Sequence, residues 1–212
     1  YEECRKKFEF SLKKAKQMAK NNIYFYRQED YERFQRNGRI ISALRNSIAN
    51  GFEGFEVYYQ PIVDCVSGRV IGAEALMRYT MVTGDGEEWL SPVEFIPLLE
   101  KTGLIIPMGR FLLNEAAKMC REIQQYIPEF RVNVNISCYQ IEHGKIADKI
   151  LTAVRDNGLT QDRICIEMTE SGFMDMTPAF CKFRKVLEEN GIQFVIDDFG
   201  TGYSNLHCIS DM

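Results

Sequence analysis

From residue 55 onward the chain alternates short runs rich in β-branched and aromatic residues with longer segments of helical spacing. The strand candidates are residues 55–63, 69–79, 131–136, 164–168 and 193–196. Strands that alternate with helices of about ten residues or more predict βαβ units and one parallel sheet. Two α/β arrangements satisfy this pattern, an open doubly wound sheet and a closed (β/α)8 barrel. No GxGxxG or GxxxxGK[ST] sequence follows a strand, which weakens the dinucleotide-binding and P-loop versions of the open sheet.

The segments between these strands carry helix signals. At Ser91 a capping box begins, with Pro92 at the first helical position and Glu94 at the third. Further helices are predicted over residues 107–126, 142–157 and 178–190, and two more precede the alternation, over 1–20 and 30–50. Asn-Gly pairs at 50–51, 157–158 and 190–191 are typical of helix ends.

Size and charge restrict the class of protein. The 212 residues suffice for one ordinary domain and a small appendage. A net charge of −4 argues against binding to DNA or RNA polymers, whose partners are usually basic, but it permits a pocket for a small anionic nucleotide. No apolar run reaches the length of about 18 residues that a membrane span needs.

The cysteine and histidine content argues against two common kinds of site. Seven cysteines occur without CxxC spacing, a pattern that favours reduced thiols and a cytoplasmic protein. The two histidines are His143 and His207. A cysteine–histidine catalytic pair or a zinc finger is therefore poorly supported.

Carboxylates or carboxamides recur on four successive predicted strands. The side chains concerned are Glu74 on the second strand, Asn133 and Asn135 on the third, Glu167 on the fourth, and Asp197 and Asp198 on the fifth. The carboxyl ends of parallel strands converge on one side of the sheet, which is where α/β proteins bind ligands and carry out catalysis.

Converging carboxylates repel one another unless cations lie between them. Oxygen donors of this kind suit Mg²⁺ or Mn²⁺, and adjacent aspartates such as Asp197 and Asp198 can serve two ions about 3.5–4 Å apart, as in phosphodiester hydrolysis. Taken singly, each residue is more typical of a structural role: Glu74 at a strand edge, Asn135 on a backbone group, Asp197 at a strand end. The repetition over four strands favours a functional site, since buried unpaired carboxylates are costly.

Over residues 52–206 the chain resembles the EAL phosphodiesterases. The blocks that carry the resemblance are Tyr59-Gln60-Pro61-Ile62-Val63, Glu74-Ala75-Leu76-Met77-Arg78, Val134-Asn135-Ile136-Ser137, Glu167-x-Thr169-Glu170-Ser171 and Asp197-Asp198-Phe199-Gly200-Thr201-Gly202-Tyr203-Ser204. The three-residue signature Glu74-Ala75-Leu76 alone would occur often by chance, but five blocks in the same order and at family-like spacing are highly specific.

The resemblance implies a (β/α)8 TIM-like barrel that hydrolyses cyclic di-GMP to linear pGpG with Mg²⁺ or Mn²⁺. It implies a first metal site of Glu74, Asn135, Glu167 and Asp197, and a second of Asp197 and Asp198, with Asp197 bridging. Gln60 and Arg78 match substrate-contacting positions. Glu170 matches the residue that anchors the loop 199–204, which the family ties to dimerisation, so a homodimer is implied for the complete protein.

Two departures from the family pattern bear on the extent of the domain. The chain ends soon after the fifth predicted strand, before the family's later lysine, glutamate and glutamine motifs. Residues 1–27 resemble the end of a GGDEF diguanylate cyclase domain. This resemblance implies a domain boundary between residues 27 and 28, so that residues 28–212 are the first part of the EAL domain. It also implies GGDEF or sensor domains upstream, through which the complete protein could be tethered to a membrane. We expect this stretch by itself to associate through its open side, or to be the ordered part of a longer chain, and to have negligible activity.

Three functions therefore stand side by side. The first is a cyclic di-GMP phosphodiesterase. The second is a degenerate EAL domain that binds the nucleotide or a protein partner without hydrolysis, and the third a metal-dependent enzyme for another substrate class on a similar barrel. The complete set of matching metal ligands favours the phosphodiesterase, because a receptor has no need of them.

Overall fold

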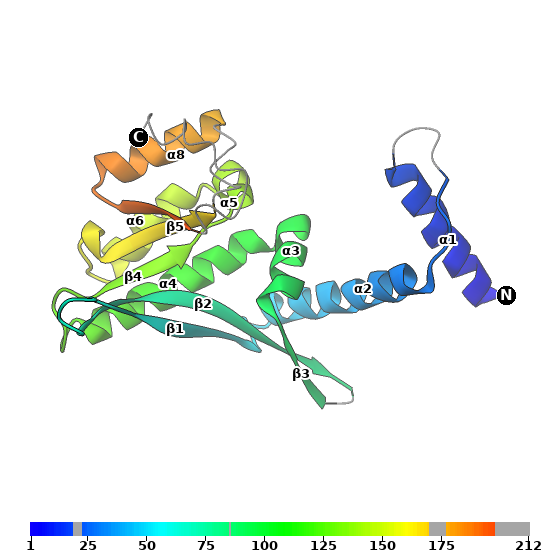
Figure 1. Cartoon of the computed structure of the whole chain (residues 1–212), viewed down its shortest axis with the longest axis horizontal. Helices are drawn as coiled ribbons and strands as arrows, with labels where there is room; N and C mark the ends of the chain where they lie inside the picture. The colour runs from blue at the N-terminus through cyan, green and yellow to red at the C-terminus, as the bar shows by residue number, and fades with distance from the viewer. Residues whose placement is uncertain (19–22, 85, 170–176, 198–212) are drawn as a thin grey trace.

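The computed structural model of the chain describes residues 1–18, 23–84, 86–169 and 177–197. In chain order the elements are α1 (Glu2–Gln17), α2 (Gln28–Ala49), β1 (Phe55–Val63), β2 (Val70–Thr83), β3 (Gly86–Leu90), α3 (Pro92–Thr102), α4 (Ile105–Ile123), β4 (Arg131–Asn135), α5 (Cys138–His143), α6 (Ile146–Asp156), the 3-10 turn η1 (Gln161–Arg163), β5 (Ile164–Thr169), α8 (Pro178–Glu189) and β6 (Gln193–Asp197) (Figure 1). All five predicted strands are present.

The sheet is mixed rather than wholly parallel. Its strand order is β1-β2-β4-β5-β6, with β3 paired to β2. Strands β2, β4, β5 and β6 run parallel, as predicted, whereas β1 pairs with β2 antiparallel. The prediction of five parallel strands is therefore wrong for β1. The link from β1 to β2 is a tight turn, in which Asp64 accepts hydrogen bonds from the backbone and hydroxyl of Ser67, both at 2.7 Å. Such a turn is too short for the crossover that parallel neighbours need.

A β-hairpin extends from the body of the domain. Strand β2 continues beyond the predicted end at Tyr79 and pairs antiparallel with β3, from Tyr79 opposite Leu90 to Thr83 opposite Gly86. The sequence prediction missed β3. The turn residue Gly86 has φ +128°, a backbone region that favours glycine.

One face of the sheet forms the main core with the helices. Alternate strand residues such as Ala75, Val134 and Ile166 are almost fully buried. Helix α4 packs against β1, β2 and β4, and α8 packs against β6 (Figure 1). The rings of Phe55 and Tyr79 stack at 4.3 Å between centroids beside the edge of Phe95 from α3. This is the layering of a (β/α) barrel wall, with helices outside the strands.

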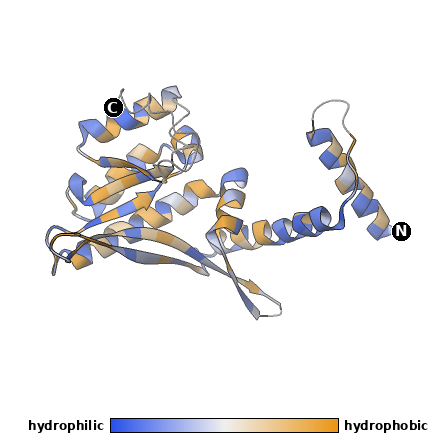
Figure 2. Cartoon of the chain, viewed as in Figure 1, coloured by the Kyte–Doolittle hydropathy of each residue, from blue (hydrophilic) through white to orange (hydrophobic). Residues whose placement is uncertain are grey.

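The helix boundaries follow from local caps. The capping box of Ser91 and Glu94 forms as predicted. The helix predicted over 142–157 is present as α6, and the separate helix α5 precedes it because the chain turns at Gly144 and Lys145, the latter with φ +48°. Helix α2 buries Ile40 and Leu44 of its second half in the core, and Figures 1 and 2 show its polar first half running outward to α1. Of the helices described, none is long and apolar enough to cross a bilayer.

Candidate functional site

The face of the sheet opposite the helices carries the polar side chains. Strand residues alternate in direction, so the burial of Ala73, Ala75, Val132 and Val134 against the helices puts their neighbours on the other face. The polar face thus combines residues from five strands: Gln60 of β1, Glu74 and Arg78 of β2, Asn133 and Asn135 of β4, Glu167 of β5 and Asp197 of β6. The structure therefore brings these residues onto one face of the sheet, and their roles as ligands or substrate contacts stay predictions.

Strand register brings the polar residues into adjacent pairs. Gln60 lies opposite Glu74, Glu74 beside Asn133, and Asn135 beside Glu167. The hydrogen bonds run diagonally across these pairs. The Nδ2 atom of Asn135 donates to Oε1 of Glu74 at 2.6 Å, and Nδ2 of Asn133 donates to Oε1 of Glu167 at 2.6 Å. Strand β4 therefore contributes one amide to each neighbouring carboxylate: Asn135 to Glu74 of β2, and Asn133 to Glu167 of β5.

The charges of the site act on Glu167. Burial raises the pKa of this half-buried carboxyl, the hydrogen bond from Asn133 lowers it, and the negative charges of Glu74 and Asp197 raise it further. The net pKa is above the ordinary value. The carboxylates are thus close enough to destabilise one another, and a cation among them would relieve that repulsion.

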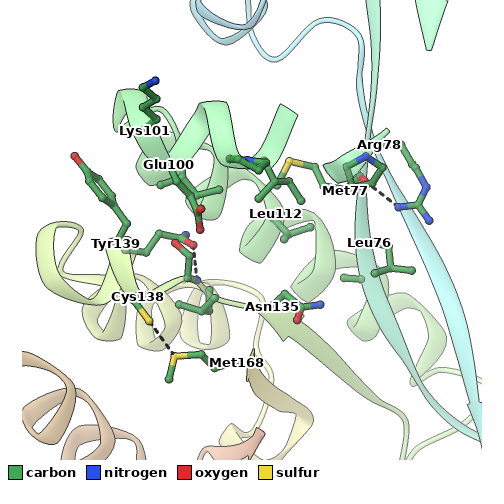
Figure 3. Close-up of a pocket in the computed structure, with 18 residues that line it drawn as sticks. Leu76, Met77, Arg78, Glu100, Lys101, Leu112, Asn135, Cys138, Tyr139 and Met168 are labelled. Atoms are coloured by element: carbon green, nitrogen blue, oxygen red, sulfur yellow. Dashed lines mark hydrogen bonds between the residues drawn. The ribbon is translucent and has the colours of Figure 1, made fainter. Parts of the chain in front are cut away.

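Arg78 stands at the edge of this polar face. Its guanidinium lies 5.4 Å from the centroid of the Tyr58 ring. Its Nη1 donates to the carbonyl oxygen of Met77 at 2.9 Å, the hydrogen bond drawn beside Arg78 in Figure 3. Tyr58 is not among the site residues that the sequence predicts. The available signal was spacing, because Tyr58 precedes Gln60 by two positions and so shares its face of the strand.

A cavity of about 850 Å³ adjoins the polar face beside the middle of β2 and the carboxyl end of β4. Leu76, Arg78 and Asn135 line one side of it, and Glu100 and Tyr139 come from α3 and α5 on the other (Figure 3). This volume lies within the range of about 300–1,000 Å³ that is usual for small-molecule sites.

The donor chemistry of the polar face fits a hard divalent cation, since every candidate ligand offers oxygen. The buried Oδ1 of Asn133 also has no hydrogen-bond partner among the described residues. Within the described part of the chain, however, no three histidine, cysteine, aspartate or glutamate side chains are grouped closely enough to hold an ion by themselves. The predicted ligand Asp198 and the loop-anchoring Glu170 lie outside the described residues.

The buried cysteines lack the character of nucleophiles. Burial raises the pKa of both Cys120 and Cys165 to about 11, so their thiols stay protonated at neutral pH.

The family model for the EAL domain matches residues 41–212 of the chain. Among curated proteins, the probable cyclic di-GMP phosphodiesterase PdeG of Escherichia coli is 33% identical over 181 residues, which cover 84% of this chain and 34% of PdeG. The bifunctional diguanylate cyclase/cyclic di-GMP phosphodiesterase MucR of Pseudomonas aeruginosa is 31% identical over 196 residues, covering 91% of this chain and 27% of MucR. The chain thus spans about a quarter to a third of these relatives.

Solved structures give the same fold. The MucR phosphodiesterase in complex with cyclic di-GMP superposes with a TM-score of 0.63 at 34% identity, over 74% of this chain and 65% of that one. An EAL enzyme bound to cAMP and cyclic di-GMP gives a TM-score of 0.74 at 29% identity, over 87% of this chain and 49% of that one. The sheet described above therefore corresponds to part of a TIM-like barrel, as the sequence predicts.

Proposed function

The chain belongs to the EAL domain family, and on that premise we propose that the complete protein of which it is part hydrolyses cyclic di-GMP to linear pGpG. The observation that carries the proposal is the pair of amides on β4, which hold Glu74 and Glu167 in place at 2.6 Å on the polar face. The similarity to PdeG, a probable cyclic di-GMP phosphodiesterase, and to MucR, a bifunctional diguanylate cyclase/cyclic di-GMP phosphodiesterase, supports the choice of substrate.

The reaction adds water across one of the two phosphodiester bonds. The water oxygen forms a new bond to phosphorus, the bond from phosphorus to the ribose 3′ oxygen breaks, and that oxygen takes up a proton. Arg78 would bind a phosphate oxygen, because its side chain lines the cavity, and Gln60 would hold the substrate from the adjacent strand. The cavity has room for part of a nucleotide beside them.

Mg²⁺ or Mn²⁺ is the proposed cofactor. The ligands would be Glu74, Asn135, Glu167 and Asp197, with Asp198 at a second ion. Such an ion, when bound, acidifies a water and neutralises charge on the phosphate. The protein's own contribution is to hold these oxygens at fixed positions, for which the two amide contacts are suited.

The alternative is a receptor that binds cyclic di-GMP without cleaving it. Both functions would use Arg78 and the cavity. The hydrogen-bonded carboxylates favour the hydrolase, because placing acids of like charge near a phosphate would weaken simple anion binding unless a cation is also bound.

The wider setting is part of the same proposal. It places the domain boundary between residues 27 and 28, with GGDEF or sensor domains upstream, a homodimer as the assembly and the cytoplasm as the compartment. The match to the EAL domain from residue 41 onward is compatible with this boundary.

The test is a turnover assay with cyclic di-GMP and Mn²⁺ on the complete protein that contains this chain, because residues 1–212 by themselves are expected to have negligible activity. We expect pGpG, loss of product on chelation with EDTA, and a fall of more than about 100-fold in Glu74→Gln, since even indirect contacts to a metal are worth 10–100-fold. Glu115→Gln on α4, on the side of the sheet that the helices cover, is the matched control and should retain turnover. Saturable nucleotide binding without any pGpG would instead support the receptor.

A further inference from the structure

Asn133 has a position in the site but no role in the function proposed above. It lies on the polar face of β4, two residues before Asn135, and its side chain is 7% exposed. Its Nδ2 donates to Oε1 of Glu167 at 2.6 Å, a short contact of the kind that charge-assisted hydrogen bonds make.

A purely structural role explains the side chain poorly. An amide buried for packing usually satisfies both its donor and its acceptor, because an unpaired buried polar atom costs free energy. The Oδ1 atom of Asn133 is buried without a hydrogen-bond partner among the described residues. The hydrogen bond to Glu167 is therefore the interaction that best accounts for an asparagine at this position.

Strand register shows why Glu167 needs such a partner. It lies directly beside Asn135, whose own Nδ2 is bonded to Glu74 on the opposite side. The amide of Asn135 therefore donates to Glu74. The donor for Glu167 is Asn133, which lies two residues earlier on the same face of β4. Each carboxylate beside β4 has its own amide.

We infer that Asn133 is a positioning residue, which fixes the Glu167 carboxylate in the orientation that binds the divalent cation. The inference rests on the proposed function, because it presupposes that Glu167 is a ligand. One oxygen of Glu167 accepts the hydrogen bond of the amide, which restricts rotation of the carboxylate and would leave its other oxygen available to a bound ion. Without the amide, ordering Glu167 on ion binding has an entropic cost that the native protein avoids.

The decisive measurement is Mn²⁺ affinity by calorimetry on the whole chain, with the electron paramagnetic resonance signal of free Mn²⁺ as a second readout. The variant Asn133→Leu has nearly the same shape but no donor, and we expect its Mn²⁺ affinity to be 10–100-fold weaker. Asn133→Ser, whose hydroxyl is too short to reach Glu167, should behave in the same way and provides a second variant with a polar side chain.

Cys165→Ala is the matched control. Cys165 lies opposite Asn133 in the register of β4 and β5, is equally buried and carries no proposed ligand role. We expect this variant to lose some thermal stability but to keep its Mn²⁺ affinity within about twofold, since the Asn133–Glu167 contact is intact.

The outcomes separate the inference from the proposed function. Native protein that binds no Mn²⁺ would overturn the metal-dependent function and this inference with it. Native-like Mn²⁺ affinity in folded Asn133→Leu or Asn133→Ser would overturn the inference alone. It would also be overturned if Cys165→Ala lost as much affinity, or if both Asn133 variants failed to fold, because Asn133 would then serve local packing.

Discussion

Arg78 is oriented by two contacts of different kinds. Its hydrogen bond to the carbonyl oxygen of Met77 fixes the guanidinium from its own strand, and the ring of Tyr58 lies against it from β1. Tyr58 is 55% exposed, so the ring is open to solvent or to a ligand on its other side. The pair therefore gives Arg78 a defined direction at the edge of the polar face.

Replacing the ring should weaken substrate binding through Arg78. In Tyr58→Leu we expect the Kd for cyclic di-GMP to rise about 2- to 5-fold, which corresponds to the 0.5–1 kcal/mol of an exposed cation–π contact. Tyr58→Phe keeps the π face and should bind like the native protein. Isothermal titration with the nucleotide measures both, and equal losses in the two variants would assign the effect to the hydroxyl rather than to the ring.

At this scale the sequence predicts which residues share a face but not which residues touch. Period-two alternation is enough to place Glu74, Asn135 and Glu167 on one side of the sheet. The diagonal amide contacts depend on the register between strands that are far apart in sequence, and no local pattern specifies that register. Asn133 and Asn135 therefore look equivalent in the sequence, although they serve opposite neighbours.

The elements around the hairpin are tied together by Arg36 of α2. One of its Nη atoms contacts Glu88 of β3 at 2.7 Å and Glu94 of α3 at 3.1 Å. The second carboxylate oxygen of Glu94 accepts from the backbone N–H of Ser91 and so caps α3. A single side chain thus links α2, the hairpin and the start of α3.

Loss of this link should be measurable but small. Because all three side chains are more than a third exposed, we expect Arg36→Met to lower the free energy of unfolding by about 1 kcal/mol at low salt. The difference should shrink in 0.5 M NaCl, where charges are screened over a few ångströms. Urea titrations at the two salt concentrations test this, with Arg39→Met on the same helix as control. A loss that is independent of salt would mean that packing of the Arg36 stem dominates.

Element types were predicted more reliably than their pairing. The five strands and the capping box at Ser91 follow from local signals, and each is present. The antiparallel β1 was missed because the βαβ pattern was applied to two strands that no helix separates. Strand β3 was missed because only five residues mark it, although Thr80-Met81-Val82-Thr83 before a glycine-rich turn was a usable hairpin signal.

At the scale of the whole molecule, the buried apolar side chains of the described residues form a large group and a small one. The main core joins the sheet to α2, α3, α4, α5, α6 and α8 and includes Phe95, which is fully buried. Phe10 and Tyr31 are also buried but lie outside that core. The ring of Phe10 contacts those of Tyr31 and Phe34 at centroid distances of 5.4 and 5.1 Å, which joins α1 to the outer half of α2.

The two groups should unfold as separate units, since few contacts connect α1 with the sheet (Figure 1). Phe10→Ala should remove hydrogen-exchange protection from α1 and leave protection in β4 and β5 unchanged. Phe95→Ala makes the same chemical change inside the main core, where we expect a loss of about 3–5 kcal/mol and lower protection across the sheet. Hydrogen exchange followed by mass spectrometry distinguishes the two variants. If Phe10→Ala lowered protection in β4 as much as Phe95→Ala does, α1 would be part of one cooperative unit with the barrel wall, and a domain boundary near residue 27 would have to be abandoned.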